Sequence, residues 1–115
     1  MVRKGYQAEL EAKKKLQKEF GIDNVIKVAI GSFGSDFIVV GKGELVKCVE
    51  VKESHSKKYY PLPQERLQLQ RILNFCKEHE IDCEIWIKYV NRGWEIKDLK
   101  EFMNNKENNK INKEQ

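Results

Sequence analysis

The stretch Asp36–Lys52 decides the fold, and it reads DFIVVGKGELVKCVEVK. Its two halves, residues 36–41 and 45–52, are rich in valine and other apolar residues. Only three residues, two of them polar and one a glycine, separate the halves. Two apolar runs joined by so short a polar connection predict a β-hairpin.

The length of that connection decides which residues of the hairpin face each other. It places Gly41 opposite Leu45, and counting back in antiparallel register brings Asp36 opposite Glu50. Facing residues have Cβ atoms about 5 Å apart. Lys52 lies two positions beyond Glu50, so it points to the same face of the sheet. The hairpin therefore gathers an aspartate, a glutamate and a lysine on one strand surface.

Further elements are predicted on both sides of the hairpin. They are a helix at 5–20, a strand at 24–30, a helix that starts at Pro61 to Pro63 and ends near 79, strands at 83–90 and 94–96, and a short helix at 97–103. This order predicts an α/β fold with a central mixed β-sheet flanked by helices. We expect one domain over residues 1–103 and a disordered polar tail over 104–115.

Composition limits the classes of protein that the chain can belong to. Of its 115 residues, 40% are hydrophobic and 35% charged, and no apolar run approaches the ~20 residues that span a bilayer. A membrane partner is therefore not expected. The three cysteines, Cys48, Cys76 and Cys83, are an odd number without a CxxC motif. They predict free thiols and a reducing, intracellular (cytoplasmic) location, and we expect small buried side chains rather than zinc ligands.

The facing carboxylates suggest a metal site. Asp36 and Glu50 repel each other at this separation unless a cation bridges them. Mg²⁺ takes oxygen ligands and keeps several waters, so these two acids and the main-chain carbonyl of Val51 suit it. Lys52 would then orient a water or stabilise charge on phosphorus. The alternative is a salt bridge from Lys52 to one of the acids on a solvated sheet face, and spacing alone leaves both open.

Glu9 is the anomaly of the first helix. At about 100° per residue its side chain lies within the apolar arc formed by Tyr6, Leu10, Leu16 and Phe20. A carboxylate that faces the core is costly unless something pairs with it. We expect Glu9 to join the hairpin acids, either binding a second ion or positioning a metal-bound water.

Short motifs follow one another in a defined order along the chain. They are Arg3-Lys4-Gly5, Glu9, Gly31-Ser32, Ser35-Asp36, Glu50-Val51-Lys52, and later YPLPQ at 60–64 and RGW at 92–94. Together they resemble the PD-(D/E)xK nucleases and, more narrowly, the archaeal Holliday-junction resolvases. The resemblance covers residues 3–96. It implies a restriction-endonuclease-like fold and a homodimer that binds four-way DNA junctions by shape and nicks two opposing strands with Mg²⁺ or Mn²⁺.

The resemblance also implies roles for single residues. Carried over by position, Glu9, Asp36, Glu50 and Lys52 form the catalytic set. A serine near the aspartate belongs to the family pattern, and Ser32 ranks before Ser35 because it follows Gly31. The family often has arginine directly after the helix glutamate, where this chain has Leu10.

The expected DNA contacts are basic residues and tyrosines. They are Arg3, Lys4, Lys14, Lys15, Lys57, Lys58, Tyr59 and Tyr60. Lysine and arginine bind phosphates without reading bases, and tyrosines can stack on unpaired bases at a crossover. The alternative is that the lysines are merely solvated and that one tyrosine belongs to the core.

The core stripe predicted for the second long helix consists of Leu62, Leu69, Ile72, Leu73 and Cys76. Two apolar residues, Leu67 and Phe75, lie off this stripe. We expect them to form an isologous dimer interface. The alternative is packing beneath the C-terminal segment, against Ile96, Leu99 and Phe102.

The sequence thus predicts a metal-dependent endonuclease that resolves four-way junctions. Two other functions remain open, namely a restriction- or repair-type nuclease on duplex or branched DNA and a catalytically inert nucleic-acid-binding module of the same fold.

Overall fold

A computed structural model describes residues 6–28, 36–41 and 44–104 of the chain. The elements in order are α1 (Tyr6–Phe20), a short 3-10 helix η1 (Ile22–Asn24), β1 (Val25–Lys27), β2 (Phe37–Gly41), β3 (Glu44–Ser54), α2 (Pro63–His79), β4 (Asp82–Tyr89), β5 (Gly93–Asp98) and α3 (Leu99–Met103). The element order agrees with the sequence prediction, apart from η1, which the sequence did not indicate. The expected tail lies outside the described residues, except for Asn104.

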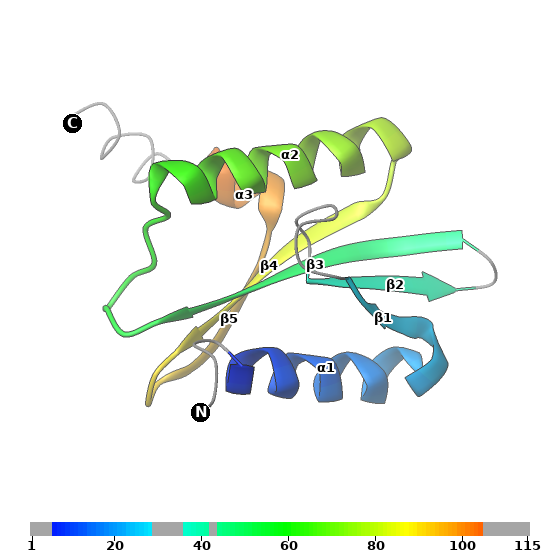
Figure 1. Cartoon of the computed structure of the whole chain (residues 1–115), viewed down its shortest axis with the longest axis horizontal. Coiled ribbons are helices and arrows are strands. Elements are labelled where there is room, and N and C mark those ends of the chain that lie inside the picture. The colour runs from blue at the N-terminus through cyan, green and yellow to red at the C-terminus, as the bar shows by residue number, and fades with distance from the viewer. Residues whose placement is uncertain (1–5, 29–35, 42–43, 105–115) are drawn as a thin grey trace.

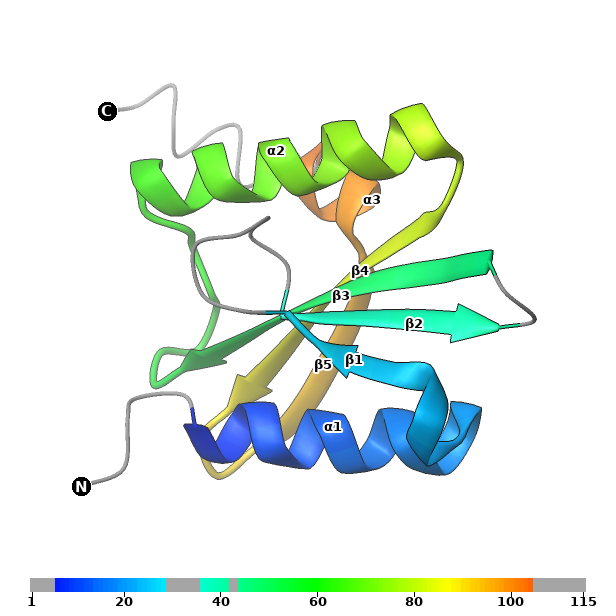
Figure 2. The ribbon, with the colours of Figure 1, turned by 45° about the vertical axis from the view of Figure 1, so that its right-hand side comes forward.

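The five strands form one mixed sheet in the order β1-β2-β3-β4-β5. Strands β3 and β4 are parallel, and the other neighbouring pairs are antiparallel. Parallel neighbours need a crossover connection, which α2 supplies. Helix α1 covers one face of the sheet, whereas α2 and α3 cover the other (Figures 1 and 2). The predicted α/β sandwich of a mixed sheet between helices is confirmed.

Each face of the sheet has its own core. On the α1 face, Ala8, Ala12 and Leu16 pack against Val25, Phe37, Val39, Val49, Val51 and Trp86. On the α2 face, Leu69, Ile72 and Cys76 pack with Cys48, Cys83, Ile85, Ile87, Leu99 and Phe102. Because residues alternate along β3, Cys48 and Glu50 face α2 while Val49 and Val51 face α1.

Two apolar residues that the helical periodicity assigned to core stripes are exposed instead. Tyr6 is exposed because α1 approaches the sheet through the small side chains of Ala8 and Ala12, which turns Tyr6 outward. Leu62 is exposed because it precedes α2 in an extended conformation, so its side chain does not follow the helical repeat. The prediction for these two positions was wrong.

The three cysteines are free and buried, as expected. Cys48 faces Cys83 across the parallel strands, and Cys76 of α2 belongs to the same core cluster. The thiol of Cys76 and burial together raise the pKa of Cys48, so this thiol stays protonated and packs as a small apolar side chain. Among the described helices none is long and apolar enough to span a bilayer.

A β-bulge in the hairpin fixes the register that the site depends on. At the turn Gly41 faces Glu44 rather than Leu45, so the expected pairing there was wrong. The register shifts by one residue between Val39 and Val40, and beyond the shift Phe37 faces Val49. The next residues beyond this pair are Asp36, which precedes β2, and Glu50 on β3. The bulge therefore restores the register that the sequence predicts at the acidic end.

Candidate active site

Four of the five expected catalytic residues line one cavity of about 320 Å³ at the start of β2, and the fifth, Ser32, lies outside the described residues. Its lining includes Glu9, Asp36, Glu50, Val51 and Lys52, together with Ala8, Glu53, Glu65 and Gln68. Three separate segments supply the expected acids, namely α1, the residue before β2, and β3, and α2 adds Glu65. The convergence of Glu9 with the hairpin residues, which the sequence predicted, is confirmed in the geometry.

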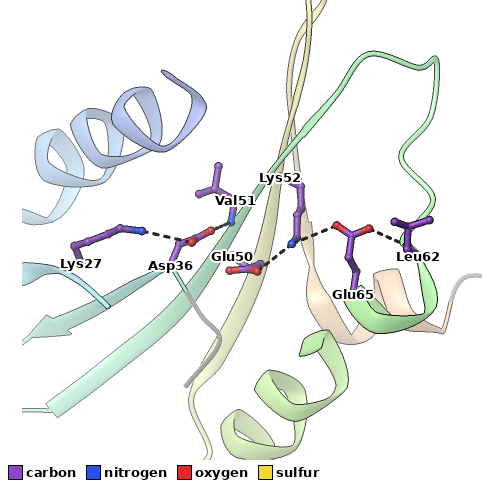
Figure 3. Close-up of polar contacts among 7 residues, drawn as sticks. All are labelled: Lys27, Asp36, Glu50, Val51, Lys52, Leu62 and Glu65. Atoms are coloured by element: carbon purple, nitrogen blue, oxygen red, sulfur yellow. Dashed lines mark hydrogen bonds and ion pairs between the residues drawn. The ribbon is translucent and has the colours of Figure 1, made fainter. Parts of the chain in front are cut away.

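Asp36 is held firmly at the entrance to β2. Its backbone N–H donates to the carbonyl of Val49 (3.1 Å), and its carbonyl accepts from the backbone N–H of Val28 (2.9 Å). Its side-chain Oδ2 accepts a hydrogen bond from the backbone N–H of Val51 at 2.7 Å (Figure 3). These contacts fix the carboxylate close to that of Glu50.

Glu50 is a buried acid with too few partners. It is only 2% exposed, and its Oε2 lies 3.4 Å from Nζ of Lys52. Its Oε1 is buried and has no hydrogen-bond partner among the described residues. Burial and the negative charge of Asp36 raise the pKa of Glu50 to about 9, because Lys52 offsets only part of their effect. Glu50 therefore retains its proton at neutral pH in the metal-free protein, because the described residues would compensate only part of its negative charge.

This donor set fits a hard divalent cation. An oxygen atom of Glu50 is unsatisfied, and Asp36 brings a second negative charge beside it. The described residues form no cluster of three or more metal-type side chains arranged around one point. The protein would thus supply two carboxylates, with the carbonyl of Val51 as a further candidate ligand. That set suits Mg²⁺, which is commonly bound through one or two carboxylates plus waters and substrate phosphate.

Lys27 is a site residue that the sequence prediction missed. Its Nζ lies 3.3 Å from Oε2 of Glu9 and 3.5 Å from Oδ1 of Asp36, so it bridges the two acids. Lys27 is two positions after the buried Val25 on β1, and this spacing directs it to the α1 face, where Glu9 also lies. The alternation of side chains along β1 was therefore the sequence signal that could have placed Lys27 in the site.

Glu65, near the start of α2, is the second missed residue. Its Oε2 lies 3.5 Å from Nζ of Lys52, and its Oε1 accepts a hydrogen bond from the backbone N–H of Leu62 (2.9 Å; Figure 3). A glutamate at the third position of a helix commonly bonds back to the cap. The usual Ser or Thr at the cap is replaced here by Leu62, so the sequence signal was weak.

The residues expected to contact DNA have different surroundings. Lys14, Lys15, Lys57 and Lys58 are exposed, and Tyr60 is 43% exposed. Tyr59 is half-buried, and its ring stacks on Phe102 with centroids 6.1 Å apart, so the alternative of one core tyrosine applies to it. Arg3, Lys4, Ser32 and Ser35 lie outside the described residues.

The two residues expected at a dimer interface also differ. Leu67 is 71% exposed on α2. Phe75 is half-buried against the α2-face core, which includes Leu99 and Phe102, and its ring centroid lies 4.5 Å from that of His79. The α2-face core therefore supplies part of the burial of Phe75, whereas Leu67 stays largely exposed in the part of the chain that the structure describes.

Comparisons with known proteins identify the fold. A scan against protein-family models finds no match, and neither does a search of the curated proteins. Among the solved structures, the fold is similar to that of a resolvase. One matching structure is that of Archaeoglobus fulgidus Hjc, a Holliday junction resolvase from an archaeal hyperthermophile, with a TM-score of 0.62 and 19% sequence identity. The match covers 84% of this chain and 78% of that one.

Proposed function

We propose that this protein is a metal-dependent endonuclease that resolves four-way DNA junctions by paired symmetric nicks. One observation carries the proposal, namely the buried and undercompensated Glu50 beside Asp36, Glu9 and Lys52 in a single cavity. The likeness in fold to a Holliday junction resolvase supports the choice of substrate.

The chain's own residues would divide the work as follows. Asp36, Glu50 and the carbonyl of Val51 would hold Mg²⁺ or Mn²⁺, and such an ion would supply Lewis acidity at the scissile phosphate and lower the pKa of a water. Lys52 stabilises the negative charge that develops on the phosphoryl oxygens. Glu9, fixed by α1, positions a water or a further cation. Lys27 offsets part of the negative charge of Glu9 and Asp36 in the metal-free protein.

Binding of the junction would rest on phosphate contacts. Lys14, Lys15, Lys57 and Lys58 are exposed, and the chain as a whole has a formal charge of +4, which a homodimer doubles. Such contacts sense the path of the backbone and not the bases, and they weaken steeply with salt. Tyr60 is the exposed ring that can stack on an unpaired base. We include Arg3, Lys4 and Ser32 in the proposed DNA-binding and catalytic sets.

The test is cleavage of an end-labelled four-way junction and of a linear duplex of the same sequence. We expect two symmetric nicks on the junction with Mg²⁺ or Mn²⁺ and none with EDTA. Cutting of the linear duplex at a similar rate would instead favour a restriction- or repair-type nuclease. Tight junction binding without cleavage under any metal condition would favour an inert binding module.

The dimer part of the proposal predicts a monomeric variant. Leu67→Glu should convert a dimer to a monomer on a sizing column, because it places a charge in an apolar contact between protomers. Ile22→Glu is the matched control, because Ile22 is 69% exposed on η1 and should leave the dimer intact. An unchanged elution volume for the Leu67 variant would contradict an interface at this point of α2.

A further inference from the structure

Lys52 is shared between two carboxylates that come from different elements. Its Nζ lies 3.4 Å from Oε2 of Glu50 on β3 and 3.5 Å from Oε2 of Glu65 on α2. The lysine and Glu65 are both largely buried, with side chains 17% and 25% exposed. Figure 3 shows the three side chains in one row, with the lysine in the middle. The position of the ammonium group is therefore set from two sides.

Glu65 is itself fixed, so it can hold the lysine in place. One carboxylate oxygen accepts from the backbone N–H of Leu62 and the other faces Lys52. Burial alone would raise the pKa of Glu65, but the donors around it outweigh burial and lower its pKa, so it is ionised. The hydroxyl of Tyr59 lies near Glu65 without forming a hydrogen bond of good geometry. The first turn of α2 thus presents a fixed negative charge to the cavity.

We propose that Glu65 is a positioning residue that holds the Lys52 ammonium over the cavity. This inference rests on the proposed nuclease function for its catalytic consequence, but not for the geometry. Without Glu65, the described partner left to Lys52 is Glu50, and the lysine would lie against the acid that is proposed to bind the metal. With Glu65, the ammonium is drawn toward α2, and Glu50 keeps an oxygen for another ligand.

The capping contact allows the two roles of Glu65 to be separated. Glutamine at this helix position can still accept the hydrogen bond from Leu62, because glutamine serves as well as glutamate in this kind of cap. Its amide N–H₂ then faces Lys52 in place of a charged oxygen. Glu65→Gln therefore removes the ion pair with Lys52 and keeps the hydrogen bond that caps the start of α2. Glu78→Gln, at an exposed position on the same helix, is the matched control.

The first measurement needs neither metal nor DNA. In the full-length protein, the two methylene protons next to the Lys52 ammonium should have different NMR shifts, because the side chain is held in one orientation. The signals are assigned by their loss in Lys52→Met. Glu65→Gln should merge them toward one shift, while Glu78→Gln should leave them apart. Retained splitting in the Glu65 variant would overturn the proposal.

The second measurement is single-turnover cleavage of a four-way junction with Mg²⁺. We expect Glu65→Gln to slow cleavage about tenfold to a hundredfold, the scale of a misplaced catalytic group, with junction affinity within about twofold of the parent. An equal loss in Glu78→Gln, or an unchanged rate in Glu65→Gln, would overturn the catalytic part. If the parent protein cuts no junction at all, the proposed function fails, whereas the NMR comparison still decides whether Glu65 orders Lys52.

Discussion

Asp36→Asn is expected to abolish junction cleavage while leaving junction binding within about threefold of the parent. The asparagine carbonyl can still accept the hydrogen bond from the Val51 N–H, so the local backbone should keep its shape. The variant loses the negative charge that helps to hold a divalent cation. A bound ion contributes several kcal/mol to stabilising a transition state, so the cleavage rate should fall at least about a thousandfold.

The measurement is the cleavage rate of a labelled junction alongside its dissociation constant in EDTA. Asp23→Asn makes the same chemical change at an exposed position on η1 and should behave as the parent. If Asp36→Asn cuts at the parental rate, Asp36 is not a metal ligand and the proposed mechanism is wrong. If binding is lost together with cleavage, the aspartate acts on the DNA or on the fold instead.

Glu50→Gln is expected to stabilise the metal-free protein at neutral and alkaline pH. The pKa of Glu50 is about 9 in the folded protein, because of burial and the Asp36 charge, against 4.5 as its ordinary value. Between these values the folded protein retains a proton that the unfolded chain has released. The free energy of unfolding of the parent therefore falls as the pH rises through this range. Glutamine does not ionise, so the variant does not lose stability in this way. We expect its free energy of unfolding to exceed that of the parent by about 1–3 kcal/mol at pH 8.

Urea unfolding in EDTA at several pH values between 5 and 9 measures the effect. The difference between variant and parent should grow with pH, whereas Glu19→Gln, at an exposed position on α1, should show no such trend. Mg²⁺ should then stabilise the parent more than the Glu50 variant, because only the parent retains both carboxylates. A variant that is less stable than the parent at every pH would contradict an undercompensated acid at this position.

The sequence was sufficient for much of the fold because its local signals agree with one another. Gly21 ends α1 with a φ of 100°, which residues with a side chain rarely adopt, and Pro63 starts α2. The alternation that puts Glu50 and Lys52 on one face of β3 is a property of any extended strand. The ion pair between these two residues follows directly from it.

The remaining features depend on tertiary contacts that no local pattern encodes. The register of the hairpin depends on a bulge between Val39 and Val40, and the pattern of apolar residues in the two strands does not predict this bulge. Lys27 and Glu65 enter the site from other elements, and their roles follow from how β1 and α2 pack against the hairpin. The core position of Tyr59 was also decided at this level, by the placement of Phe102 on α3.

The bulge has a consequence for how the hairpin tolerates insertions and deletions. Adding one residue between Val46 and Glu50 would turn the acid from the α2 face to the α1 face, because strand residues alternate and the bulge already takes up one extra residue. A single-codon insertion in this segment would thus act as a chemical substitution in the cavity, placing a valine where the glutamate had been. Length changes on the turn side of the bulge carry no such penalty, so that end of the hairpin is the natural place to attach a label or a tag.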